Sequence, residues 1–166
     1  MTKFENAHPV GLKARLALGL LLYTACRRED VVRIGPQHIN DGRLRYTQAK
    51  NEHRNPVTLD IPVHTDLQAL IDATPSKHLT FLVTEFGKPF SPAGFGNWFR
   101  DRCNKAGLPH CSAHGLRKAA ATRLAERGAT THEIMSITGH RNLEEVERYT
   151  RDAQKARLAD SAMSKW

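Results

Sequence analysis

Residues 11–25 read GLKARLALGLLLYTA, and this stretch organises the rest of the chain. Leu12, Leu16, Leu20 and Tyr23 follow one another at spacings of four, four and three residues, with good helix formers between them. A spacing of this kind places the apolar side chains on one side of a helix. The stretch therefore predicts a largely buried helix around which a core can form.

A short second helix is predicted directly after the first. Residues 27–30 are strongly polar, so the chain reaches the surface there, and Gly35-Pro36 then stops helical structure. These limits place the second helix at Glu29 to Arg33. Arg27 is accordingly expected in the turn between the two helices.

An antiparallel hairpin is predicted next. Residues 43–49 and 56–61 alternate apolar with polar side chains, and Asn40-Asp41-Gly42 introduces the first of these stretches as a turn. The connection between them, residues 50–55, is polar throughout. We therefore expect two paired strands joined by an exposed loop.

The remaining periodic segments are helical, which makes the fold class mainly α with a small antiparallel β-sheet or hairpin (α+β). Leu116, Ala120 and Leu124 are expected to form the buried stripe of one helix, which ends at a left-handed Gly128. Thr130 or Thr131 is expected to cap the following helix, with Glu133 in its first turn and Gly139 at its end. The expected helices cover residues 64–73, 95–106, 114–127, 131–139, 143–149 and 152–165, with a loop and a short strand at 81–84 before Pro92.

The charge balance indicates an anionic partner. The chain has 166 residues and a formal net charge of +8. Its basic residues are concentrated between Arg100 and Gly128, where Lys and Arg far outnumber Asp and Glu. A clustered positive charge of this kind favours nucleic acid as the partner.

The sequence favours a soluble, cytoplasmic protein that carries no cofactor or metal. Its longest apolar run is far shorter than the roughly 20 residues that cross a bilayer, and the first nine residues lack the pattern of a secretory signal. Cys26, Cys103 and Cys111 are odd in number and include no Cys-x-x-Cys pair. We therefore expect reduced thiols, no membrane partner and no zinc site.

Five short motifs occur in an order typical of a known family. They are Thr24-Ala-Cys-Arg-Arg-Glu-Asp30, the hairpin turn at Lys50, His114-Gly-Leu-Arg117, Thr138-Gly-His140 and Arg148-Tyr-Thr150. This set resembles the catalytic boxes of tyrosine site-specific recombinases of the phage integrase type. The resemblance implies the DNA breaking-rejoining enzyme fold. It also implies that the protein is bacterial or phage-encoded and nucleoid-associated, and that it assembles on double-stranded DNA with other recombinase subunits.

The chemistry of such an enzyme explains why arginines are needed at the reacting phosphate. Attack on a DNA phosphodiester gathers negative charge on the non-bridging oxygens, and preorganised cations lower that barrier. Arg27 and Arg117 are the candidates, because a guanidinium can bind two oxygens at once and stays charged. His114 and Arg117 are three residues apart, so on one helix both can reach the same phosphate.

The other catalytic roles follow from the resemblance. Tyr149 is implied as the nucleophile that forms a 3'-phosphotyrosine, with His114 accepting its proton and His140 donating a hydrogen bond to the phosphate. Lys50 is implied as the acid that protonates the departing 5' oxygen, and Arg54 is a nearby rival for that role. No ATP is needed, because the covalent intermediate retains the phosphodiester energy.

The sequence departs from the family pattern at Ala25, Asp30 and Thr138, where glycine, glutamate and leucine are usual. Ala25 is tolerable provided that the backbone there needs no positive φ angle, and Asp30 can brace the arginine turn. Relatives carry a separate helical DNA-binding domain before the catalytic one. We therefore expect residues 1–166 to be a single catalytic domain without that amino-terminal domain, and residues 1–10 to be a linker remnant. Residues 151–166 are expected to form a tail helix that docks on a neighbouring subunit or packs on its own domain.

Other basic residues are candidates for contacts to DNA outside the reacting phosphate, namely Arg28, Arg54, Arg100, Lys118, Arg123 and Arg141. The expected function is site-specific DNA recombination and integration by metal-independent strand cleavage and rejoining. Three alternatives remain open: a catalytically idle DNA-binding module of the same fold, a type IB topoisomerase-like nicking-closing enzyme, and a nuclease or integrase built on metal-binding carboxylates.

Overall fold

Helix α2 (Lys13–Thr24) lies at the centre of the main hydrophobic core. The computed structural model describes residues 1–50 and 52–166, and the side chains of all of these except Tyr149 and Gln154. Leu16 and Leu20 are fully buried as the periodicity predicts, whereas Leu12 is exposed because it serves as the N-cap. Helix α4 (Thr65–Asp72) packs closely on α2 where Gly19 leaves room for the side chain of Leu70.

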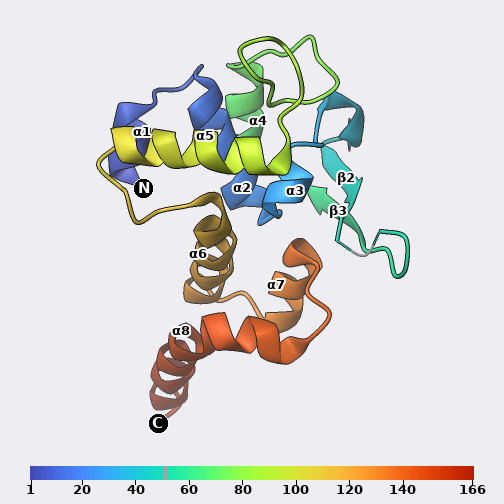
Figure 1. Ribbon diagram of the computed structural model, residues 1–166. Helices are drawn as coiled ribbons and strands as arrows, with labels where there is room; N and C mark the ends of the chain where they lie inside the picture. Colours follow the sequence, from blue (N-terminus) through green and yellow to red (C-terminus); the bar gives the residue numbers. More distant parts are fainter. Residues whose placement is uncertain (51) are drawn as a thin grey trace.

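The first residues form a packed helix, so the expectation of a linker at residues 1–10 was wrong. Helix α1 (Thr2–Ala7) lies against α5 (Pro92–Lys105), as Figure 1 shows. Phe4 is buried and stacks on Phe99 with 5.3 Å between ring centroids. His8 is also buried, and its Nε2 lies 2.9 Å from the carbonyl oxygen of Arg102. The apolar contacts of Phe4 make this segment part of the core.

The predicted hairpin belongs to a three-stranded antiparallel sheet in the order β1-β2-β3. Strands β2 (Arg43–Thr47) and β3 (Thr58–Pro62) pair along their whole length, with Tyr46 opposite Leu59. The additional strand β1 (Ile39–Asn40) has only two residues, too few to show a period in the sequence. The strand expected at residues 81–84 is reduced to a single bridge between Val83 and Pro89.

The second short helix and helix α7 lie close to the positions that the sequence predicts. Helix α3 (Arg28–Val31) starts one residue earlier than predicted, and a 3-10 turn (Pro36–His38) follows it. Helix α7 (Thr131–Thr138) is capped by Thr130, whose hydroxyl accepts a hydrogen bond from the Glu133 backbone N–H. Gly139 ends α7 in the left-handed region with φ of 69°. The capping predictions for this helix are confirmed.

Helix α6 (Ala113–Glu126) connects the upper layer to the lower helices in Figure 1, and its buried face differs from the prediction. Besides Ala120, the buried residues are Ala113, Arg117, Ala121 and Ala125, while Leu116 and Leu124 are only partly buried. Because alanine side chains are small, α8 can approach α6 closely on the alanine side. The buried face of α6 is therefore formed mainly by alanines and not by the predicted leucines. Gly128 takes a φ of 92° just beyond the helix, as expected.

The last segment is one helix, α8 (Leu143–Met163), so the predicted break between residues 149 and 152 was wrong. Neither glycine nor proline interrupts this stretch, and the buried Thr150 hydroxyl donates a hydrogen bond to the Val146 carbonyl, which keeps the turn intact. Val146 packs in a second, smaller cluster with Ala121, Ala125 and Ile134. The tail helix is thus the second half of α8, and residues 158–166 are all exposed. Within the described part of the chain, no helix is long and apolar enough to cross a membrane.

Candidate active site

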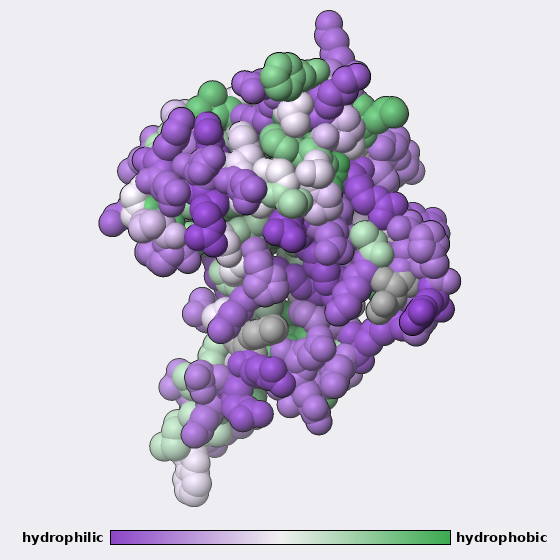
Figure 2. Space-filling model, viewed as in Figure 1, coloured by the Kyte–Doolittle hydropathy of each residue, from purple (hydrophilic) through white to green (hydrophobic). Residues whose placement is uncertain are grey.

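One cleft collects five of the six predicted catalytic residues from separate parts of the chain. Its volume is about 670 Å³, and its lining includes Arg27, Lys50, His114, Arg117 and His140. They come from the α2–α3 turn, the turn after β2, helix α6 and the residue after Gly139. Figure 2 shows that hydrophilic residues cover most of the middle of the molecule, between the upper layer and the lower helices. The geometry therefore brings together side chains that are far apart in sequence.

Arg27 is positioned by a strained turn that Asp30 supports. Ala25 ends α2 with φ of 48°, so the condition under which alanine would be tolerated without strain at this position is not met. A non-glycine residue in that conformation costs on the order of 1 kcal/mol. Asp30 accepts hydrogen bonds from the backbone N–H groups of Arg27 at 3.2 Å and Ala49 at 2.7 Å. This carboxylate fixes the arginine turn and also links it to the residue before Lys50.

The carboxyl of Asp30 is held inside the protein. It is 2% exposed, and burial raises its pKa, against the two backbone donors and the charge of Arg27. The donors satisfy the carboxylate in place of water, as a buried acceptor requires. The bracing role expected of this shorter carboxylate is confirmed by these contacts.

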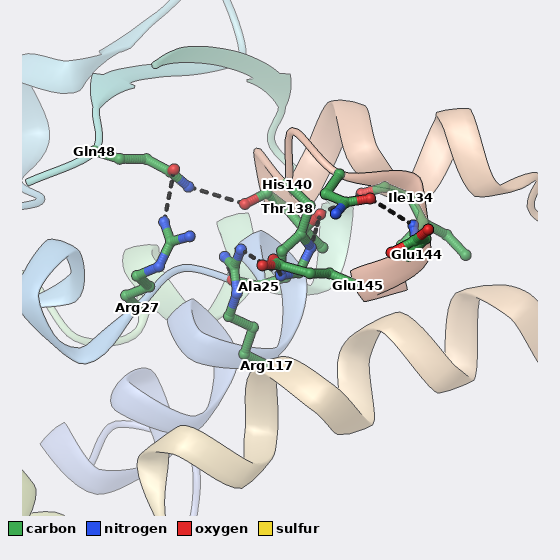
Figure 3. Close-up of polar contacts among 10 residues, drawn as sticks. Ala25, Arg27, Gln48, Arg117, Ile134, Thr138, His140, Glu144 and Glu145 are labelled. Carbon is green, nitrogen blue, oxygen red and sulfur yellow. Dashed lines mark hydrogen bonds and ion pairs between the residues drawn. The ribbon is translucent and has the colours of Figure 1, made fainter. Parts of the chain in front are cut away.

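Arg117 is buried and hydrogen-bonded to other groups of the protein. Its Nη1 donates to the Ala25 carbonyl at 2.7 Å, and its Nη2 lies 3.1 Å from His140 Nε2, as Figure 3 shows. Burial and, secondarily, the charge of Arg27 lower its pKa to about 10. The guanidinium therefore keeps its charge at neutral pH, and its plane is fixed by partners on two different elements.

His140 is held as one neutral tautomer. Because a guanidinium is a donor only, Nε2 must accept from Arg117, and the proton of the neutral ring lies on Nδ1. Nδ1 donates to the Thr138 hydroxyl at 2.8 Å, and that hydroxyl donates to the Ile134 carbonyl. The threonine that departs from the family pattern thus orients the imidazole. Here Nε2 is an acceptor, whereas the sequence led us to expect a donor toward phosphate; that role stays a prediction.

The environment of His140 opposes protonation. Its side chain is 8% exposed, and burial together with the charge of Arg117 lowers its pKa to about 4. Glu145 acts in the opposite direction, with its Oε2 at 3.9 Å from Nε2. The neutral imidazole is therefore the resting form at physiological pH.

We expect the titration of His140 to make the fold less stable in mild acid. An unfolded histidine has a pKa of about 6.5, so between that pH and 4 the unfolded chain binds more protons. The stability due to neutral His140 is fully present above pH ~6.5 and is lost as the pH falls toward 4, with a slope of at most about 1.4 kcal/mol per unit. Urea unfolding of wild type and His140→Gln from pH 7 to 4 measures the difference in free energy of unfolding between the two proteins at each pH. If this difference in free energy of unfolding is the same at pH 7 and pH 4, His140 does not have a lowered pKa in the folded protein.

Gln48 belongs to the site although the sequence reasoning missed it. The Arg27 Nη1 donates to Gln48 Oε1 at 2.6 Å, and Gln48 Nε2 donates to the Thr138 carbonyl at 2.9 Å. A signal was present in the alternation of β2, because Leu44, Tyr46 and Gln48 share one face of the strand and the first two are core residues. A glutamine on an inward face needs internal hydrogen-bond partners.

His114 and Lys50 are exposed on the wall of the cleft. His114 lies in the first turn of α6, whose N-cap Ser112 accepts a hydrogen bond from the Gly115 backbone N–H at 3.3 Å. Because α6 is helical here, His114 and Arg117 line the same cleft, as the three-residue spacing predicts. Lys50 also lines it, whereas its rival Arg54 is exposed in the hairpin loop and does not.

The candidate DNA contacts divide into two groups. Arg28, Arg100 and Lys118 line the cleft beside the predicted catalytic residues. Arg141 instead donates to the Asn55 side chain at 2.7 Å, and Arg123 donates to the Met1 sulfur at 2.8 Å. Among the described residues that line the cleft, Arg54, Arg123 and Arg141 are absent. The lining also includes residues that the sequence did not suggest, namely Glu29, Gly96, Asn97, Ser112, Ala113, Glu145 and Arg148.

Tyr149 lies in α8 directly after Arg148, which lines the cleft. The side chain of Tyr149 lies outside the described part of the structure, so its role as nucleophile stays a prediction. Among the described residues, no group of three or more His, Cys, Asp or Glu side chains is arranged to hold a metal ion.

Known proteins resemble this chain in sequence. The model of the phage integrase family matches residues 1–156, a span that includes helix α1. Tyrosine recombinase XerC 2 of Ralstonia nicotianae is 28% identical over 159 residues, which cover 90% of this chain and 46% of that protein. Tyrosine recombinase XerC of Bacillus subtilis is 24% identical over 170 residues, covering 96% and 56%. The chain spans about half the length of the curated relatives it matches.

Solved structures share the fold. A lambda integrase dimer bound to a COC' core site superposes with a TM-score of 0.71 at 23% identity, over 90% of this chain and 56% of that one. XerA recombinase superposes with a TM-score of 0.69 at 17% identity, over 93% and 65%. The predicted mainly helical fold with a small antiparallel sheet is confirmed.

Proposed function

The chain belongs to the phage integrase family, and on that premise we propose that it cuts and rejoins double-stranded DNA through a covalent bond to Tyr149 in site-specific recombination. The observation that carries this proposal is the convergence of Arg27, Lys50, His114, Arg117 and His140 on one cleft. These groups come from segments far apart in sequence; Arg117, for example, donates a hydrogen bond to the carbonyl of Ala25, 92 residues away. The described residues thus bring positively charged side chains and side chains that can accept or donate a proton into one cleft.

The proposed reaction is a phosphoryl transfer to the tyrosine oxygen. Tyr149 loses its proton to His114, its oxygen forms a bond to the scissile phosphorus, and the bond from phosphorus to the 5' oxygen breaks. Lys50 gives a proton to that oxygen, which is otherwise a poor leaving group. The product is a 3'-phosphotyrosine, and reversal of the same steps by a different 5' hydroxyl rejoins the strand.

Arg27 and Arg117 stabilise the charge that develops on the non-bridging oxygens. Both are held by protein acceptors before DNA arrives, so little reorganisation is needed during the reaction. Arg28, Arg100 and Lys118 extend the positive lining along the cleft and suit the flanking backbone phosphates. Double-stranded DNA is therefore the proposed substrate.

Assembly with other recombinase subunits on DNA is also part of the proposal. A lambda integrase neighbour was solved as a tetramer bound to a Holliday junction, with a TM-score of 0.67 to this chain. The exposed second half of α8 and the three residues after it leave the apolar side chains of Leu158, Met163 and Trp166 available for another subunit. Residues 1–166 act in this proposal as a single catalytic domain.

A suicide substrate tests the proposed function. The protein is incubated in EDTA with duplex DNA nicked close to the cleavage site. Cleavage then releases a short fragment that carries the 5' hydroxyl; this fragment diffuses away, so religation fails. We expect a covalent adduct on a denaturing gel, with peptide mapping placing it at Tyr149. DNA binding without an adduct would instead favour an idle binding module. Cleavage that EDTA abolishes would favour carboxylate-bound metal, and relaxation of supercoiled DNA without strand exchange would favour the topoisomerase alternative.

A further inference from the structure

Gln48 occupies an unusual position for an amide side chain. It is 2% exposed, follows the last residue of β2 and contacts the C-terminal residue of α7. Burial of an amide is unfavourable unless its donors and acceptor are satisfied. Gln48 has a hydrogen-bond partner at each end of the amide, as Figure 3 shows.

The two partners belong to different halves of the candidate active site. Oε1 accepts from Arg27 Nη1 at 2.6 Å, and Nε2 donates at 2.9 Å to the carbonyl of Thr138, the residue whose hydroxyl orients His140. The orientation of the amide is determined, because a guanidinium can only donate and a carbonyl can only accept. One side chain thus connects the arginine turn to the loop that carries the histidine.

The backbone around Gly139 is shaped to accept this contact. A Cβ atom on Gly139 would lie 2.7 Å from Gln48 Nε2, closer than packed atoms approach. Gly139 also has a φ of 69°, which disfavours other residues. Glycine at this position therefore serves the approach of Gln48 as well as the end of the helix.

We propose that Gln48 is a positioning residue that holds the Arg27 guanidinium against the scissile phosphate. This inference rests on the proposed function. By fixing Nη1, Gln48 restricts rotation of the guanidinium and leaves its other N–H groups for the phosphate oxygens. Arg27 is itself only partly buried, so without Gln48 its flexible side chain would sample orientations outside the reactive one.

The test compares charged and neutral scissile linkages. Gln48→Met keeps the volume of the side chain but removes both hydrogen bonds. In single-turnover cleavage of a normal phosphodiester, we expect this variant to be slower than wild type by about 10- to 100-fold, the loss typical of a hydrogen bond to a charged group. A methylphosphonate at the same position has a methyl group in place of one non-bridging oxygen, so it carries one negative charge fewer for Arg27 to stabilise, in the ground state and in the transition state. On that substrate the deficit should shrink to about threefold or less, because an arginine out of place then costs little.

Two further variants calibrate the result. Arg27→Ala should show the same pattern with a larger deficit on the charged linkage. Thr58→Ala removes a hydroxyl hydrogen bond to Thr47 at 2.9 Å, on the exposed side of the same hairpin, and should cleave both substrates at the wild-type rate. Urea unfolding of each variant reports whether the fold is retained.

The outcomes separate the inference from the function on which it rests. Equal rates for wild type and Gln48→Met on the phosphodiester would overturn the positioning role, and so would the same deficit on both linkages, which would show a general structural effect. If the wild type itself forms no adduct at Tyr149 on either substrate, the proposed function falls and the inference falls with it.

Discussion

Replacing Tyr149 with phenylalanine is expected to eliminate the covalent adduct and to lower strand cleavage by at least about 10⁴-fold. Phenylalanine lacks the oxygen that forms the bond to phosphorus, so the proposed intermediate cannot form at all. Duplex binding should stay within about threefold of wild type, because basic residues provide most of the affinity for the DNA backbone. Adduct formation on a suicide substrate and binding by anisotropy measure the two effects separately.

Tyr23→Phe is the matched control for this prediction. The Tyr23 hydroxyl donates to Asp66 Oδ2 at 2.8 Å in an exposed pair, and Tyr23 does not line the cleft. We therefore expect it to form the adduct at the wild-type rate. An adduct that persists in Tyr149→Phe would identify a different nucleophile. Wild type and Tyr149→Phe that bind DNA equally and both fail to cleave it would indicate a binding module.

Arg117→Lys is expected to slow cleavage by about 10²- to 10³-fold, the loss seen when one preorganised donor to a developing charge is removed. The guanidinium uses one nitrogen on the Ala25 carbonyl and another on His140 Nε2. A lysine ammonium is a single point that cannot reach both and also meet a phosphate. Single-turnover rates with saturating DNA measure this loss directly.

The same change should destabilise the fold. Leaving the Ala25 carbonyl or His140 Nε2 without its donor costs about 1–3 kcal/mol. Urea unfolding at pH 7 measures this cost. Arg127→Lys is the control, because Arg127 is exposed at the end of the same helix α6 and does not line the cleft. We expect wild-type rate and stability for it. A wild-type cleavage rate in Arg117→Lys would show that a positive charge alone suffices at this position.

The local parts of the site were predictable because they depend on neighbours in sequence. His114 and Arg117 line one cleft because helical geometry places residues three apart side by side. The cap at Thr130 and the left-handed Gly139 follow from hydrogen bonds within a few residues. The hairpin was visible because alternation along a strand directly records which side is buried.

Other features could not be predicted from local pattern. Arg123 and Arg141 resemble the other basic residues in sequence, yet they contact Met1 and Asn55 instead of the cleft. Arg117 contacts the α2–α3 turn, and His140 is neutral because it is buried beside Arg117, so both properties depend on residues distant in sequence. Residues 1–10 were expected to be a linker, because a single buried ring, Phe4, is too weak a signal without its partner on α5.

By itself the sequence determined the helical core around residues 11–25, the hairpin, the order of the five motifs and the residue types available for phosphoryl transfer. These properties depend on side-chain chemistry and on contacts within a few residues of each other. Only the tertiary structure decided which cations share the cleft, which tautomer His140 adopts and that Gln48 joins Arg27 to Thr138. Those properties depend on distances between segments and on the exclusion of water. Both are set when helices and sheet pack together, and neither leaves a period in the sequence.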